Sequence, residues 1–152
     1  MLSIHAQSTH WNGTVGIRQH DLDHIMFGDV AGWFYNYLAG IAPVASQPGF
    51  RSILFYPRPV RRLAWAQASI ASHWGGIRSA WRWAGGRLLW TIRIPPGASG
   101  HLIFPGSAGR PIRGKGPNIG RFSVYRNGDQ QLAALGPGVY RFSYTPRPGR
   151  LR

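Results

Sequence analysis

The hydrophobic pattern of this chain changes its period near Pro48, and that change restricts the fold more than any other feature of the sequence. After Pro48, short stretches alternate between large apolar and polar residues, as half-buried strands do. Glycines and prolines separate these stretches, and residues 84–87 (Ala-Gly-Gly-Arg) have the composition of a tight hairpin turn. Seven strands are predicted, over 50–56, 63–71, 76–83, 87–94, 100–104, 121–126 and 138–144. Such spacing is typical of an antiparallel β-sandwich.

Residues 25–41 follow a different pattern, in which apolar residues recur every three or four positions. This period predicts one α-helix ahead of the sandwich, ended by Gly40 and Pro43. Its apolar belt is wider than the stripe of an amphipathic surface helix, which is typical of a buried helix. Gly28 and Gly32 each cost about 1 kcal/mol relative to alanine, which indicates a closely packed neighbour. The predicted fold class is therefore mainly β, a sandwich preceded by one amphipathic-to-buried helix.

The same change of period divides the chain into two regions. Residues 1–45 would hold a loop and the helix, and residues 46–152 the sandwich, with a flexible Gly/Pro/Arg-rich loop at 106–120. A length of 152 residues suits one domain, or one domain with a fragment of another. We expect neither a signal peptide nor a membrane span, since no apolar run approaches the roughly 20 residues that a span needs. Localisation is left open, with the cytoplasm as the default.

The charge is strongly basic, with eighteen Lys and Arg against four Asp and no Glu, a net charge of +14. Such a surface attracts nucleic acid or anionic lipid non-specifically. The basic residues are spread from Arg18 to Arg152, which favours a compositional bias over a dedicated nucleic-acid site. Cysteine is absent, which excludes disulfides and thiolate metal sites. The four acids are Asp21, Asp23, Asp29 and Asp129.

Three further patterns have competing interpretations. Residues 20–24 (His-Asp-Leu-Asp-His) could bind a metal, but aspartates near a helix start also act as caps, and we favour the cap and predict no metal or cofactor. Residues 109–116 nearly form a P-loop, but the final Ser/Thr is missing and Pro117 follows, so nucleotide binding is not expected. Several tryptophans could stack on sugar rings, although packing in the core is the better expectation. They are Trp65, Trp74, Trp81, Trp83 and Trp90.

A series of short segments then occurs in one order along the chain. They are 24–29 (HIMFGD), 33–35 (WFY), 38–41 (LAGI), 48–51 (PGFR), 57–59 (PRP), 76–81 (GIRSAW), 94–98 (IPPGA), 105–106 (PG) and 135–142 (LGPGVYRF). In that order they resemble the C-terminal region of bacterial-type α-L-rhamnosidases, glycoside hydrolase family 78, from about residue 11 to 144. The resemblance implies that the helix is the last one of the family's (α/α)6 catalytic barrel. The strands would then form the C-terminal β-sandwich domain.

The family removes terminal α-L-rhamnose from glycosides with inversion, which takes an acid and an opposed carboxylate base roughly 6.5–9.5 Å apart. The resemblance implies that the acid lies upstream of this chain. It places the family's catalytic Glu at Thr9, or at Asn12 in a shifted alignment, and neither residue can be a carboxylate base. No catalytic residue is therefore predicted. By the same resemblance, His24 and Trp11 would bind rhamnose in the complete enzyme.

The leading interpretation is a C-terminal fragment of an α-L-rhamnosidase that is inactive alone. One alternative is a stand-alone carbohydrate-binding β-sandwich module, and a second is a basic nucleic-acid-binding protein. The expected partners are a rhamnose-containing glycoside in the complete enzyme and, through the helix at 25–41, either the missing catalytic barrel or a second copy of this chain. Neither a specific nucleic acid nor a membrane is an expected partner.

Overall fold

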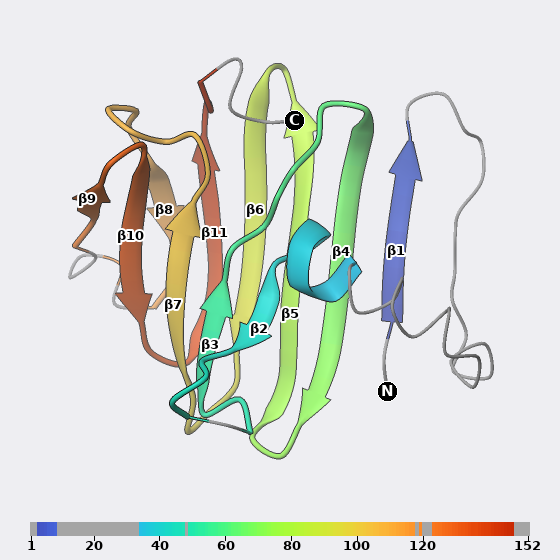
Figure 1. The fold of residues 1–152 in the computed structure, drawn as a ribbon, viewed down its shortest axis with the longest axis vertical. Helices are drawn as coiled ribbons and strands as arrows, with labels where there is room; N and C mark the ends of the chain where they lie inside the picture. The colour runs from blue at the N-terminus through green and yellow to red at the C-terminus, as the bar shows by residue number, and fades with distance from the viewer. Residues whose placement is uncertain (1–2, 9–33, 48, 118, 120–122, 148–152) are drawn as a thin grey trace.

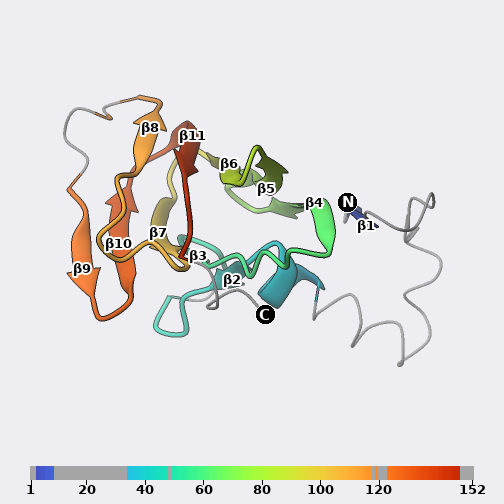
Figure 2. The same ribbon diagram turned by 90° about the horizontal axis from the view of Figure 1, so that it is seen from above.

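The protein is a sandwich of two β-sheets that face one another (Figure 1, Figure 2). The computed structural model describes residues 3–8, 34–47, 49–117, 119 and 123–147. The six-stranded sheet has the order β1-β4-β5-β6-β11-β8, and the five-stranded sheet has the order β2-β3-β7-β10-β9. Within the described residues, β3 and β7 form the one parallel pair, and all other pairs are antiparallel. The predicted mainly β, antiparallel sandwich is confirmed.

The strands have the following bounds. The six-stranded sheet contains β1 (Ser3–Ser8), β4 (Leu63–Ser72), β5 (Gly75–Ala84), β6 (Arg87–Ile94), β11 (Gly138–Tyr144) and β8 (Arg113–Lys115). The five-stranded sheet contains β2 (Ile41–Pro43), β3 (Ser52–Phe55), β7 (Ser99–Phe104), β10 (Gln130–Leu135) and β9 (Tyr125–Asn127).

Each of the seven predicted strands overlaps an observed one, and β6 and β11 begin and end where the sequence predicts. The hairpin between β5 and β6 is also confirmed, because Gly85 and Gly86 both have positive φ, 55° and 76°, as a two-residue turn of this kind requires. Four strands were not predicted, namely β1, β2, β8 and β10. Strand β10 is built of Gln, Ala and Leu, which favour helices, and its pairing with β7 and β9 overrides that preference.

The predicted helix over 25–41 differs from the structure at its end. The described part is one π-helical turn, η2 (Phe34–Leu38), and Ile41 already belongs to β2. Gly40 separates the two elements with φ of +67°, and a Cβ there would lie 2.1 Å from the carbonyl carbon of Tyr56. Because β2 pairs with β3, the sheet begins at Ile41, ahead of the predicted boundary after residue 45. Residues 25–33 lie outside the described residues, so that part of the helix stays a prediction.

The stretch predicted as a flexible loop, 106–120, contains β8, an edge strand that pairs with β11. Ser107 and Ala108 at its start are buried. The Gln131 side chain on β10 donates hydrogen bonds to the carbonyls of Ser107 and Arg110. These contacts fix the start of the segment against the five-stranded sheet, so the prediction of a continuous loop is wrong at β8. Strand β8 could not be recognised from its Gly/Pro-rich composition, because its pairing partner, β11, lies far away in the sequence.

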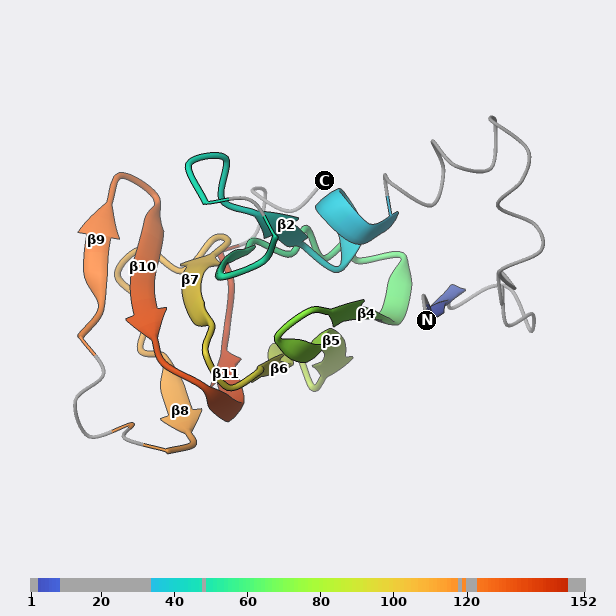
Figure 3. The ribbon, with the colours of Figure 1, turned by 90° about the horizontal axis from the view of Figure 1, so that it is seen from below.

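The hydrophobic core lies between the sheets and is rich in large aromatic side chains. On β6 every second residue, from Leu88 to Ile94, points into this core. The end of η2 completes it: Leu38 and the following Ala39 are buried, and η2 contacts β4 where the five-stranded sheet does not reach (Figure 1, Figure 3). No helix within the described ranges is long and apolar enough to cross a membrane.

Candidate functional site

The predicted site residues Thr9, Trp11, Asn12 and His24 lie outside the described residues, as does the whole 20–24 motif. Their roles stay predictions. In the part of the chain that the structure describes, Asp129 is the one acidic residue, in the turn between β9 and β10.

The surroundings of Asp129 bear on whether this region could catalyse glycoside hydrolysis. Asp129 lines a hollow of about 360 Å³ together with Tyr56, Asn127 and Gln130. Inverting glycoside hydrolysis needs two opposed carboxyl groups. Because Asp129 is the one acid among the described residues, that part of the molecule contains no such pair.

The first site that the structure defines is the attachment of η2 to β5. The indole Nε1 of Trp81 donates a hydrogen bond of 2.7 Å to the carbonyl of Leu38. The Ser79 hydroxyl donates one of 2.6 Å to the carbonyl of Ala39. Carbonyls at the end of a helix have no partner within the helix, so both bonds satisfy groups that would otherwise be buried unpaired. We call these four residues, together with Trp90, the junction clamp.

Trp90 on β6 extends this network, because its Nε1 donates a hydrogen bond of 3.0 Å to the Ser79 hydroxyl. Ser79 is fully buried, with 0% of its surface exposed. Its single hydroxyl thus both donates and accepts within the core. Two strands of the six-stranded sheet are thereby joined to the segment that enters the sandwich.

A second group of contacts fixes the backbone just after the junction clamp. The amide of Tyr56 donates to the carbonyl of Gly40 at 2.8 Å, and the amide of Arg58 donates to that of Tyr37 at 2.9 Å. The Arg58 guanidinium lies 5.3 Å from the Tyr37 ring centroid and 4.7 Å from that of Tyr56, a cation–π arrangement. The segment from η2 to β2 is therefore held along its length by the sandwich.

The second site is the outer face of the six-stranded sheet, which is turned away from the core. Alternation of side chains puts the polar positions of β5, β6, β8 and β11 on this face. We call its seven cations the basic face: Arg78, Arg82, Arg87, Arg93, Arg113, Lys115 and Arg141. All are exposed except Arg87, which is half-buried and donates a hydrogen bond of 2.9 Å to the Ser143 hydroxyl.

A trench crosses the basic face perpendicular to the strands. Over β5 and β6 its floor is formed by Ala80 and Thr91, which are register partners, together with Leu89. One end is a hollow of about 240 Å³ lined by Trp65 and Gln67, and the other is a hollow of about 770 Å³ lined by Arg141 and residues of β8. The two hollows share three lining residues and are therefore continuous.

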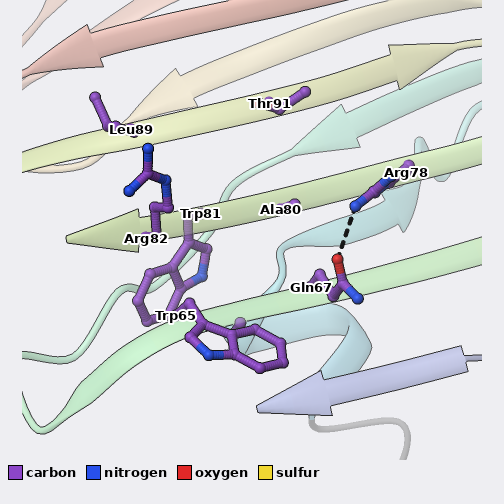
Figure 4. A pocket seen from close by; sticks show the side chains of 9 residues that line it. Trp65, Gln67, Arg78, Ala80, Trp81, Arg82, Leu89 and Thr91 are labelled. Atoms are coloured by element: carbon purple, nitrogen blue, oxygen red, sulfur yellow. Dashed lines mark hydrogen bonds between the residues drawn. The ribbon is translucent and has the colours of Figure 1, made fainter. Parts of the chain in front are cut away.

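Arginines border the trench on both sides. Arg78 and Arg82 stand on either side of Ala80 along β5, and Arg78 donates a hydrogen bond of 2.8 Å to the Gln67 side chain (Figure 4). Arg93 is the register partner of Arg78. This cluster was not predicted, because the basic residues are spread along the chain and gather only when the strands pair. The available signal was arginine at the polar positions of successive predicted strands.

The tryptophans divide between the core and the surface. Packing is confirmed for Trp81 and Trp90, which are buried, and Trp83 is half-buried against the core. Trp74 is 36% exposed, with the Arg51 guanidinium 5.9 Å from its ring centroid. Trp65 is half-buried at one end of the trench.

Tyr144 and Tyr140 pack in the core, and their hydroxyls donate hydrogen bonds to backbone carbonyls. Tyr144 donates a hydrogen bond of 3.1 Å to the carbonyl of Pro105. Burial raises the pKa of Tyr144 well above its usual range, and the electrostatic effect of Tyr56 adds to the rise. Tyr140 donates one of 3.0 Å to the carbonyl of Gly136, and burial raises its pKa as well.

The near P-loop at 109–116 has the wrong local structure for phosphate binding. A P-loop leads from a strand into a helix N-terminus. Here the segment leads into β8, an edge strand of the sheet.

Fold and junction clamp together define a β-sandwich domain that follows, in the same chain, a helical segment packed against its core. Residues 40–117 match the family described as the bacterial alpha-L-rhamnosidase C-terminal domain, and the match begins at the glycine between η2 and β2. The chain belongs to this family, as the motifs predict.

Relatives with known names agree with this assignment. The chain is 30% identical over 86 residues to an alpha-L-rhamnosidase of Streptomyces avermitilis, covering 57% of this chain and 8% of that protein. It is 24% identical over 130 residues to an alpha-L-rhamnosidase of Formosa agariphila, covering 83% of this chain and 14% of that protein.

Solved structures have the same fold. The Streptomyces avermitilis alpha-L-rhamnosidase complexed with L-rhamnose matches with a TM-score of 0.66 at 25% identity, covering 79% of this chain and 11% of that one. The alpha-L-rhamnosidase from Dictyoglumus thermophilum matches with a TM-score of 0.66 at 27% identity, covering 81% and 14%. The chain thus spans no more than 14% of the length of these relatives.

Proposed function

We propose that this chain works as the C-terminal region of an α-L-rhamnosidase and hydrolyses no rhamnoside by itself. In the complete enzyme a catalytic barrel would bind the terminal α-L-rhamnose and hydrolyse its glycosidic bond with inversion. The sandwich would hold the last helix of that barrel.

The observation that carries the proposal is the lack of an opposed carboxyl pair. Inversion requires one carboxylic acid to protonate the leaving oxygen and one carboxylate to activate water on the opposite side of the sugar. The chain has four aspartates and no glutamate, and Asp129 is the one acid in the described ranges. The other three aspartates, at 21, 23 and 29, lie within nine residues of sequence, in the region assigned by resemblance to the start of the last barrel helix.

The junction clamp supports the structural part of the proposal. Leu38 and Ala39 are buried in the sandwich core, and their carbonyls accept hydrogen bonds from Ser79 and Trp81 of β5. A domain that buries the end of a helix in this way holds that helix in a fixed position relative to the sheet. The part of the predicted apolar belt that precedes η2 would face that barrel, because large apolar surfaces seldom stay exposed on soluble proteins.

The test is an assay of the purified chain with 4-nitrophenyl α-L-rhamnopyranoside, with the Streptomyces avermitilis relative as the positive control. We expect release of 4-nitrophenol no faster than in buffer. Turnover by the chain that is abolished in His24→Ala would overturn the proposal, because it would place a working rhamnose pocket in this polypeptide.

A further inference from the structure

We propose that the trench across the basic face binds an acidic oligosaccharide, with the arginines recognising its carboxylate groups. This goes beyond the proposed function, which assigns the sandwich only a structural role. The choice of a saccharide over another polyanion rests on that function. The presence of the trench and its positive charge do not depend on the proposed function.

The charge of this surface is the first argument. Seven cations project from one side of the six-stranded sheet. The one acid in the described ranges, Asp129, belongs to a turn of the other sheet. Anionic groups are therefore the complementary ligands of this face.

The register of the strands supplies the second argument. Arg78 lies directly opposite Arg93, and Arg141 lies directly opposite Lys115. Like charges at directly opposed positions of a sheet are destabilising. Two such pairs on the same face leave a repulsion that a bound anion would relieve.

The shape of the trench is the third argument. It runs over five neighbouring strands from β4 to β8, which at the usual strand spacing is about 19 Å. Arg78 and Arg82 are four residues apart on β5, which separates their α-carbons by roughly 13 Å. The small side chains of Ala80 and Thr91 leave space over β5 and β6, and the next residues in the same row, Arg141 and Lys115, bring their cationic groups to the end of that space.

The chemistry of the lining residues favours carboxylates on a sugar. A guanidinium binds a carboxylate through two parallel hydrogen bonds, and the Gln67 oxygen already orients that of Arg78. Trp65 provides one half-buried aromatic surface at the trench end. On β4, β5, β6, β11 and β8 the other outer-face side chains are not aromatic, so these strands lack the row of stacking rings that single-stranded nucleic acids use.

The experiment measures binding of a short oligogalacturonate to the full chain by calorimetry, at low and at physiological ionic strength. The same oligosaccharide with all its carboxylates methyl-esterified is the neutral control. The test variant is Arg82→Gln with Arg141→Gln. The charge-matched control is Arg110→Gln with Arg126→Gln, which are exposed and do not line the trench.

We expect the acidic form to bind and the ester not to bind. The trench variant should bind about tenfold more weakly, since each exposed ion pair contributes only modestly. The control variant should bind within about threefold of the parent chain, because distant charges are screened. Thermal unfolding of both variants checks that they remain folded.

Four results would overturn the proposal. They are undetectable binding of the acidic form, equal binding of the ester, equal weakening by the two double variants, and equal or tighter binding of a single-stranded DNA oligonucleotide that also depends on Arg82 and Arg141. None of them bears on rhamnoside turnover. The failure of this inference is therefore distinguishable from the failure of the proposed function.

Discussion

Removal of the Ser79 hydroxyl is the sharpest test of the junction clamp. The hydroxyl donates to the carbonyl of Ala39 at 2.6 Å and accepts from Trp90 Nε1 at 3.0 Å, in a fully buried position. Ser79→Ala therefore leaves two buried polar groups without a partner. A buried unsatisfied group costs about 1–3 kcal/mol, so the free energy of unfolding should fall by about 2–6 kcal/mol.

Urea denaturation followed by tryptophan fluorescence measures this loss. A domain of this size loses about 2–4 °C in Tm per kcal/mol, so thermal unfolding should show a Tm lower by roughly 4–24 °C. Ser99→Ala is the matched control, because Ser99 is exposed at the start of β7. It should change the free energy of unfolding by no more than about 0.5 kcal/mol.

A double-mutant cycle with Trp90→Phe separates the two lost hydrogen bonds. Phenylalanine has no indole N–H, so in this background Ser79→Ala leaves only the Ala39 carbonyl unpaired. The serine substitution should then cost about 1–3 kcal/mol less than in the parent chain. Two results would contradict the hydrogen bonds of the junction clamp: a loss for Ser79→Ala no larger than that for Ser99→Ala, or the same loss for Ser79→Ala in both backgrounds.

Two further predictions concern the interior and the turn at the junction. Burial raises the pKa of Tyr144 above the ordinary value of 10.0, so above about pH 10 the folded chain keeps a proton that the unfolded chain loses. The free energy of unfolding is therefore unaffected by Tyr144 below about pH 10. Above that pH it falls by up to about 1.4 kcal/mol per pH unit. Urea titrations at several alkaline pH values should show this slope reduced in Tyr144→Phe, and an unchanged slope would contradict the assignment. Gly40→Ala should destabilise the chain by more than about 3 kcal/mol or prevent folding, because its Cβ would meet the backbone of Tyr56 at 2.1 Å. Gly128→Ala, with similar positive φ but open space around it, should cost only about 1–2 kcal/mol when the two variants are compared by urea denaturation, and equal losses at the two sites would contradict the steric explanation.

Some elements could be predicted because their signals are local. In β6 and β11, apolar and polar residues alternate with the period of a strand, and the two glycines between β5 and β6 specify the turn. Strand β10 could not be predicted this way, since its residues favour helices and only its neighbours make it a strand. The same holds for β8, because its three residues lie in a Gly/Pro-rich segment and form a strand only by pairing with β11.

The candidate sites depended on different kinds of information. The absence of glutamate and the position of Thr9 and Asn12 by resemblance are properties of the sequence, and they predicted a chain without a catalytic pair. The junction clamp joins residues about forty positions apart, so no local pattern could reveal it.

The sequence alone determined that this protein is a β-sandwich of the α-L-rhamnosidase C-terminal family, because alternation, turn glycines and the order of the motifs are features of the sequence itself. Only the tertiary structure decided that seven of its dispersed cations share one face and that a trench runs between them. The physical reason is that burying one side of every strand in a common core fixes the register between strands. That register then sets which polar residues on the opposite side become neighbours.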